Sequence, residues 1–172
     1  IEQSHADIGP MAIVEAPDGS FLVSGGPSRN FLYRFDRFGG EAFNPWAEVP
    51  YPIFNMAFDA EGRLWATTGG GPLLQLDPDS GRIVEEFGEP GSGDLYMAAG
   101  AVWSGGVAGT AGGIVVFDPD TETFTRFNRD LNLRVASLAF APDGTLWATT
   151  WPDRRQVVRF TDQRRAELVL QF

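Results

Sequence analysis

The chain has 172 residues, of which 21 are glycine and 13% aromatic, with no cysteine and a formal net charge of −10. This acidity makes nucleic acid and anionic membranes poor partners, because their phosphate groups are repelled. The lack of cysteine excludes disulfides and thiolate metal sites, and there is no run of about 18 apolar residues to span a membrane.

The chain opens with a lead-in over residues 1–10, which shows no strong hydrophobic period. The first repeating unit follows as four short apolar runs, at residues 11–16, 20–24, 31–35 and 41–43. Turn residues separate these runs, which predicts four strands in a meander. Three prolines lie within residues 44–54. Because proline removes a backbone donor, this segment is predicted to be a connector without strands.

The second unit, residues 55–87, shows the pattern most plainly: the runs MAF, LWAT, LLQL and IVEEF are separated by turn residues. Residues 88–94 lead into the third unit. Its first turn is predicted at MAAG, which ends at Gly100, so that the second strand begins beyond this glycine. The glycine-rich stretches GGG and GTAGG lack the lysine and the following helix of a phosphate-binding loop, and are predicted to be strand connectors.

The four units share markers at corresponding places. Each has a glycine at its first turn, a large residue in the second strand, and characteristic residues at the ends of the third and fourth strands. The turn glycines are Gly19, Gly62, Gly100 and Gly144, and the large residues after them are Leu22, Trp65, Trp103 and Trp147. The third strands end at Phe35, Leu76, Phe117 and Phe160, and the fourth at Phe43, Phe87, Phe127 and Phe172.

A period of about 40 residues with four short strands per period is typical of β-propeller blades. One blade cannot cover both of its faces, so neighbouring blades must stack on it. We therefore predict an all-β fold, a β-propeller of four four-stranded antiparallel blades in a single domain or segment over residues 1–172. The blades are expected at about residues 11–43, 54–87, 95–127 and 135–172. The alternative is a β-sandwich in which the similarity of the units is accidental.

Two Asp-Pro-Asp segments, Asp77–Asp79 and Asp118–Asp120, lie between the third and fourth strands of their units. Aspartate can accept a hydrogen bond from the backbone two residues on, and proline presets φ, so both are predicted to be turns. An EF-hand-like calcium loop would need alternating oxygen ligands and a glutamate at its twelfth position, which neither segment has. We predict no metal site, no cofactor and no catalytic residue.

The segment GRLWATTGGGPLLQLDPDSGRIVEEF, residues 62–87, resembles the repeat of bacterial two-component-regulator propellers. It is about as similar to the blades of virginiamycin B lyase-like and NHL-type propellers. The shared features are Gly-x-Leu-Trp after a turn, a strand ending in Asp-Pro, and a short strand closing on phenylalanine. The resemblance covers nearly the whole chain.

Such propellers form rings of about six to eight blades, so the resemblance implies that these four blades belong to a longer polypeptide. Two copies could instead complete a ring, or four blades could close alone. The chain begins with Ile1 rather than methionine, as expected of a processed form or a segment of something longer. The regulator propellers are extracytoplasmic ligand-sensing domains, which implies a periplasmic or secreted bacterial location. The lyase-like propellers include an enzyme that uses a catalytic histidine and Mg²⁺.

In a propeller, the loops between second and third strands share one face with the loops that enter each first strand. Aromatic, arginine and amide side chains in these loops suit a polar, ring-shaped or carboxylated ligand, through stacking and bidentate hydrogen bonds. The candidate ligand-binding residues are Arg29, Asn30, Tyr51, Asn55, Asp94, Tyr96, Arg134, Trp151 and Arg154, accompanied in the same loops by Trp46, Asn132, Asp153 and Arg155. The alternative is an ordinary solvated loop face.

The last unit is the most basic part of the chain. Residues 131–172 hold six arginines and four acidic residues, whereas residues 1–130 hold seven arginines and 19 acidic residues. An anionic or polar partner is therefore expected there, unless these arginines form only a solvated surface.

The sequence favours a non-catalytic binding or interaction module, sensor-like and part of a larger extracytoplasmic protein. Its expected partner is a polar small molecule, a carbohydrate or another protein, with self-association or further blades completing the ring. The alternative function is a streptogramin lyase- or lactonase-like enzyme. Such an enzyme needs a general base or a metal ligand. The only histidine is His5 in the lead-in, and Asp94 is the best-placed carboxylate. A third interpretation, a purely structural repeat, predicts no pocket.

Overall fold

The computed structural model describes residues 9–36, 45–59, 61–69, 71–88, 97–103, 106–110, 113–127, 131, 133–151, 154–162 and 165–172. In this part of the chain the strands form four separate sheets, each of four antiparallel strands in simple chain order. These residues contain no helix, and hence none long and apolar enough to cross a membrane.

Each sheet is one blade of the predicted propeller. Blade 1 consists of β1 (Ala12–Glu15), β2 (Phe21–Gly25), β3 (Phe31–Phe35) and β4 (Ala47–Glu48), and blade 2 of β5 (Asn55–Phe58), β6 (Leu64–Thr67), β7 (Leu73–Leu76) and β8 (Ile83–Phe87). Blade 3 consists of β9 (Met97–Trp103), β10 (Gly106–Thr110), β11 (Ile114–Asp118) and β12 (Thr123–Arg126), and blade 4 of β13 (Val135–Phe140), β14 (Leu146–Thr150), β15 (Gln156–Asp162) and β16 (Arg165–Gln171).

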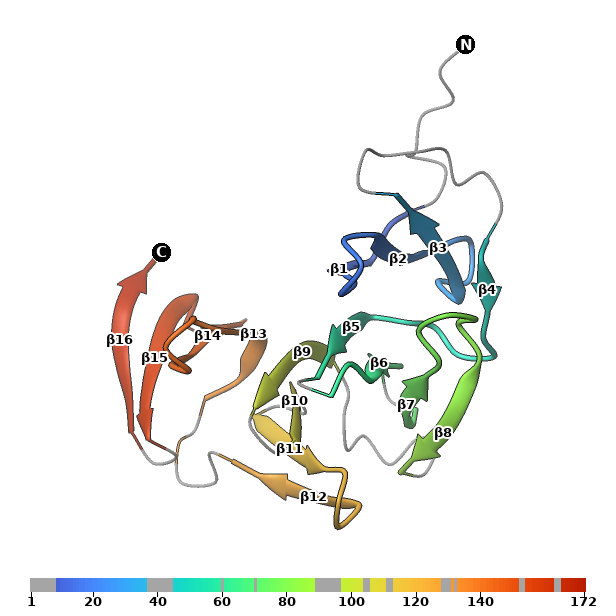
Figure 1. Ribbon diagram of the computed structural model, residues 1–172. Coiled ribbons are helices and arrows are strands. Elements are labelled where there is room, and N and C mark those ends of the chain that lie inside the picture. The colour runs from blue at the N-terminus through green and yellow to red at the C-terminus, as the bar shows by residue number, and fades with distance from the viewer. Residues whose placement is uncertain are drawn as a thin grey trace.

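The blades follow one another along an open arc (Figure 1). The first strands β1, β5, β9 and β13 lie toward the middle, and the fourth strands lie at the periphery. Blades 1 and 4 stand at the two ends of the arc. The prediction of an all-β fold built from four stacked blades is confirmed.

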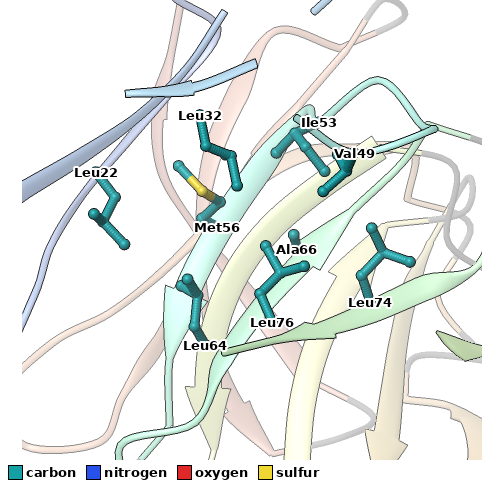
Figure 2. Packing of buried hydrophobic residues seen from close by; sticks show 9 residues of the cluster. All are labelled: Leu22, Leu32, Val49, Ile53, Met56, Leu64, Ala66, Leu74 and Leu76. Atoms are coloured by element: carbon teal, nitrogen blue, oxygen red, sulfur yellow. The ribbon is translucent and has the colours of Figure 1, made fainter. Parts of the chain in front are cut away.

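A separate apolar cluster fills each junction between consecutive blades. Between blades 1 and 2, the buried residues are Leu22, Leu32, Val49, Ile53, Met56, Leu64, Ala66, Leu74 and Leu76 (Figure 2). Side chains alternate along a strand, so Leu64 and Ala66 face blade 1 while Trp65 between them joins the cluster shared with blade 3. Each fully buried leucine contributes about 1.5–3 kcal/mol.

Trp65 is the largest side chain at the junction of blades 2 and 3, and only 1% of its surface is exposed. Its ring centroid lies 5.8 Å from that of Phe87 in its own blade and 5.7 Å from that of Phe117 in blade 3. Phe87 and Phe117 are 4.7 Å apart. The three rings therefore join the two blades through tilted aromatic contacts.

The strand register corrects the predicted first turn of blade 3. Gly100 lies inside β9, and Trp103 is the last residue of that strand, paired with Gly106. Val107 pairs with Phe117 as Leu64 pairs with Leu76, so Ala108 occupies the place that Trp65 has in blade 2. The expected equivalence of Trp103 with Trp65 is therefore wrong, whereas that of Trp147, which follows Leu146 in β14, is confirmed.

The fourth strand of blade 1 also lies elsewhere than predicted. Ala47–Glu48 pairs with β3 inside the segment predicted to be a connector, while residues 41–43 lie outside the described residues. The strand is two residues long and lies at the edge of its sheet, where neighbouring prolines are tolerated. A turn of blade 2 packs on it: a Cβ added at Gly81, whose φ is +69°, would lie 2.4 Å from the Ala47 Cβ.

The two predicted Asp-Pro-Asp turns are confirmed, and the first turns of blades 1 and 4 contain the same bond. In each, an aspartate carboxylate accepts a hydrogen bond from the backbone N–H two residues on. The bonds are Ser20 N to Asp18 (2.9 Å), Asp79 N to Asp77 (3.1 Å), Asp120 N to Asp118 (2.9 Å) and Thr145 N to Asp143 (2.9 Å). These bonds favour the ionised carboxylate. With the Ser20 hydroxyl donating as well and Arg34 nearby, the pKa of Asp18 falls from 3.8 to about 2.

These lowered carboxyl pKa values predict destabilisation in acid. A carboxyl group whose pKa is lower in the folded than in the unfolded state stabilises the folded protein at pH values above its unfolded-state pKa. This stabilisation is lost as the pH falls through the folded-state pKa. The contribution of Asp18 should therefore disappear between about pH 4 and about pH 2. Urea unfolding at about pH 6 and about pH 3 should show a lower free energy of unfolding at the lower pH, and a smaller pH dependence in Asp18→Ala. Equal stability at both pH values would contradict this.

Candidate functional site

The loop rim comprises the loops between the second and third strands of each blade and the segments that enter each first strand. The candidates described there are Arg29, Asn30, Tyr51, Asn55, Arg134, Trp151 and Arg154, with Trp46 and Arg155; Asp94, Tyr96, Asn132 and Asp153 lie outside the described residues. The structure divides them into two groups. The blade 1–2 group consists of Arg29, Asn30, Trp46, Tyr51 and Asn55, and the blade 4 group of Arg134, Trp151, Arg154 and Arg155.

In the blade 1–2 group, Arg29 joins the two blades. It has a φ of 60°, in a tight loop where its N–H donates to the Gly26 carbonyl at 3.0 Å. Its own carbonyl accepts from the Ile53 N–H at 2.7 Å, and its guanidinium lies 5.6 Å from the centre of the Phe54 ring. Phe54 in turn packs on Gly69, where an added Cβ would come within 2.3 Å of the ring. Arg29 is thus held against the entry to blade 2.

Asn30 holds the outer strand of blade 1. Its side-chain amide donates to the Glu48 carboxylate at 3.2 Å and to the Val49 carbonyl at 3.0 Å. The Val49 N–H donates back to the Asn30 carbonyl at 3.0 Å. The chain after β4 is therefore fixed by this side chain, and the role of Asn30 here is structural.

Tyr51 and Asn55 also have partners within the protein. The Tyr51 hydroxyl donates to the Glu86 carboxylate at 2.9 Å. This bond is the main cause of the raised pKa of Tyr51, and desolvation is the second. The Asn55 side-chain oxygen accepts from the Met56 N–H at 2.9 Å. The polar side chains of Asn30, Tyr51 and Asn55 therefore hold the local structure of blade 1, the connector and blade 2. Neither Glu48 nor Glu86 was identified from the sequence, because each lies far along the chain from the residue it holds.

Trp46, the remaining aromatic of this region, packs against the blade 1–2 cluster. Arg34 lies over it, with the guanidinium carbon 5.6 Å from the ring centroid. Trp46 therefore belongs to the connection between the blades.

The blade 4 group is different, because its central side chain is exposed. Trp151 follows β14, and 57% of its surface is accessible. Its N–H donates to the Arg134 carbonyl at 3.0 Å, so the two strand-end segments are tied together. The Arg155 guanidinium lies 5.1 Å from the Trp151 ring centroid, a cation–π contact. The side chains of Arg134 and Arg154 are exposed in the same segments.

Hydrogen bonds hold the described residues on either side of the loop that follows Trp151. Arg155 has a φ of 46°, and its carbonyl accepts from the N–H of Phe172 at 3.1 Å. The Thr150 hydroxyl accepts from the Gln156 N–H at 3.0 Å. Blade 4 thus presents a large exposed aromatic ring beside the guanidinium of Arg155, with the exposed side chains of Arg134 and Arg154 in the neighbouring described residues.

A hollow of about 330 Å³ opens at the opposite ends of the strands, where the turns of blade 4 meet the end of blade 3. Phe127, Leu146 and Phe160 form its apolar wall, and Asp143 and Asp162 lie at its edge. The backbone N–H of Thr145 holds the Asp143 carboxylate and lowers its pKa. The sequence did not indicate this hollow, because its lining comes from two blades.

Among the residues that the structure describes, no three histidine, cysteine, aspartate or glutamate side chains gather closely enough to share a metal ion. His5 and Asp94, the residues considered for an enzyme, lie outside the described residues.

The comparisons with known proteins point to the fold. No protein-family model matches the chain, and no curated protein matches it. Among solved structures, a streptogramin B lyase aligns with a TM-score of 0.70 and 16% identity, over 98% of this chain and 56% of that one. Virginiamycin B lyase from Staphylococcus aureus gives 0.70 and 15%, over 98% and 57%. The computationally designed Ika4 protein gives 0.59 and 13%, over 93% and 94%.

These similarities and the four stacked sheets define the class: the chain is an all-β propeller protein built from repeated blades. It spans a little more than half the length of the lyases that it matches. At these identities the likeness concerns the fold alone.

Proposed function

We propose that this chain is a non-catalytic binding propeller, and that the blade 4 group of the loop rim binds a ring-shaped ligand carrying a carboxylate, such as an acidic sugar. The observation that carries the proposal is the exposed Trp151 ring stacked with Arg155. In this proposal the protein is a sensor-like part of a larger extracytoplasmic bacterial protein.

The chemistry of this group suits such a ligand. An exposed indole offers a flat apolar face on which a sugar or aromatic ring can stack. Arginine presents a planar set of donors that binds a carboxylate through two parallel hydrogen bonds. Residues 131–172 carry an excess of arginine in a chain whose net charge is −10. An anionic ligand is therefore attracted to blade 4 and repelled by the remainder of the surface.

Calorimetric titration with oligogalacturonate, and with an uncharged galactose oligomer of equal length, tests the proposal. The acidic oligomer should bind more tightly than the neutral one. Trp151→Ala and Arg154→Ser should each weaken binding about tenfold, which corresponds to about 1.4 kcal/mol. Val84→Ala, a change at an exposed apolar residue of blade 2, is the matched control and should bind as the parent does. Failure of the acidic oligomer to bind, or unchanged binding in Trp151→Ala, would contradict the proposal.

The alternative, a streptogramin lyase-like activity, is favoured by one observation, the alignment of 98% of the chain with a streptogramin B lyase. A catalytically inactive virginiamycin B lyase with quinupristin is also similar, at a TM-score of 0.67. Incubation of the chain with quinupristin and Mg²⁺, followed by mass spectrometry, tests this alternative. Because His5 is the only histidine, a histidine-dependent reaction must disappear in His5→Ala. Unchanged quinupristin would remove the alternative.

A further inference from the structure

The two end blades of the arc expose faces that correspond to faces buried elsewhere in the molecule. The strand register assigns the same positions in every blade, so the surroundings of one position can be compared between blades. Two faces matter here: the face of blade 4 that points away from blade 3, and the face of blade 1 that points away from blade 2.

The outward face of blade 4 repeats the face that blade 2 buries. In blade 2, paired residues place Trp65 beside Ala57, and Leu73 beside Phe87. All four are buried, and Trp65, Leu73 and Phe87 form one cluster with Val115 and Phe117 of blade 3. In blade 4 the corresponding positions are Ala139, Trp147, Val157 and Leu170.

The residues of blade 4 at these positions are less covered. Trp147 is only half-buried, and 49% of Leu170 is exposed. Arg159 lies 6.0 Å from the Trp147 ring centroid, and its guanidinium donates to Glu167 at 2.5 Å. The face therefore carries apolar side chains at the positions that blade 3 covers in blade 2. It differs in the neighbouring pair, which is Arg159 and Glu167 in blade 4 but Gln75 and Glu85 in blade 2.

The outward face of blade 1 offers the complementary half. Ile13 pairs with Val23 as Met56 pairs with Ala66 and as Leu138 pairs with Ala148. Met56 and Leu138 are 3% and 8% exposed between blades, whereas Ile13 is 65% exposed.

Phe35 extends the comparison. It pairs with the first residue of β2, as Phe117 pairs with Val107 in blade 3. Phe117 is fully buried against Trp65, whereas Phe35 is only half-buried. Blade 1 thus presents an aromatic side chain at the position from which blade 3 contacts Trp65.

We propose that a second copy of this chain covers both faces, so that blade 1 of each copy stacks on blade 4 of the other and closes an eight-bladed ring. The contact would place Phe35 of one copy against Trp147 of the other, as Phe117 lies against Trp65. Such a head-to-tail contact closes when the rotation between copies permits it.

Charge supports this occupant. Residues 11–48, which include blade 1, hold three arginines and five acidic residues, whereas residues 131–172, which include blade 4, have the opposite excess. Opposite charges favour contact between unlike ends over contact between like ends.

A designed protein that aligns over 94% of its own length shows that this fold occurs in a chain of about this size.

The other possible occupant is a set of further blades in the same polypeptide. Four blades cover 56% of the streptogramin B lyase chain, which leaves room there for about three more blades of similar length. The mass of the 172-residue chain in solution shows whether a second copy covers these two faces.

Sedimentation velocity and light scattering of the purified chain test the proposal. We expect twice the mass of one chain, and the mass of a single chain for Trp147→Glu and for Ile13→Glu. An equimolar mixture of these two variants should recover a pair, since one intact contact remains between the unaltered faces. Val84→Glu, which places the same charge on blade 2 away from both faces, should leave the pair intact.

Circular dichroism and a thermal melt of each variant show that the blades remain folded. A single-chain mass for the parent, a pair that survives Trp147→Glu, or a mixture that fails to recover the pair would overturn the proposal. The same holds for a mass that grows steadily beyond two copies, because it would show that the ring does not close.

Discussion

Replacing Trp65 with alanine should lower the free energy of unfolding by about 3–5 kcal/mol, the range for removing a fully buried large aromatic side chain. The indole is 1% exposed and contacts Phe87 and Phe117, so its loss leaves a cavity between blades 2 and 3. Urea unfolding followed by circular dichroism measures the change.

The matched control for this substitution is Trp147→Ala. Trp147 has the same place in the register of blade 4, but no blade among the described residues stacks on it. Its removal should therefore cost about 1 kcal/mol, as measured on the single chain at a concentration where no pair forms. Equal losses in the two variants would mean that the stacking of blade 3 on Trp65 does not determine the stability of blade 2.

Replacing Asp59 with alanine should cost about 2–4 kcal/mol, because it leaves charged and polar partners unpaired. The Asp59 side chain is only 5% exposed. It accepts hydrogen bonds from the Trp65 indole N–H at 2.8 Å, from the Arg63 guanidinium at 2.5 Å and from the Arg63 backbone N–H at 2.8 Å. Burial alone would raise the pKa of Asp59, but the bonds from Trp65 and Arg63 outweigh it and lower this pKa.

Glu61 provides the control for this prediction. Its carboxylate lies 3.2 Å from the same Arg63 guanidinium, but its side chain is 65% exposed. A solvent-exposed ion pair contributes about 0–1 kcal/mol, so Glu61→Ala should lose less than about 1 kcal/mol. If Asp59→Ala and Glu61→Ala have equally small effects in chemical denaturation, the indole of Trp65 does not depend on the carboxylate of Asp59.

The repeat could be predicted from the sequence where local turn chemistry and burial agree. In blades 2 and 4, a glycine with positive φ ends the first turn and Leu-Trp follows, so both registers are as expected. In blade 3, the run AAGAVW imitates this pattern, yet Gly100 continues β9 and the tryptophan position is taken by Ala108. Glycine inside a strand is unusual but permitted. Only the pairing with β10 shows that β9 continues past Gly100 to Trp103.

The short outer strand of blade 1 could not be predicted for a different reason. Ala47–Glu48 is held by the side chain of Asn30 on Val49 and by the packing of Gly81 on Ala47. Both contacts involve residues distant in the chain, and a two-residue run between prolines has no hydrophobic period of its own.

The candidate site shows the same division. Antiparallel connectivity placed the loops on one rim, but it could not show that Asn30 and Tyr51 are engaged by Glu48 and Glu86. Nor could it show that Trp151 stays exposed beside Arg155. Those distinctions depend on side-chain packing between blades, which composition and spacing do not determine.

The stacking of successive blades is tested most directly by nuclear Overhauser contacts of the Trp65 indole in the isotope-labelled chain. The structure predicts cross-peaks from the indole protons to the ring protons of Phe87 and Phe117 and none to the methyl groups of Leu22, which lies in the cluster on the other side of blade 2. Cross-peaks to Leu22 in place of Phe117 would contradict the order and the facing of the blades.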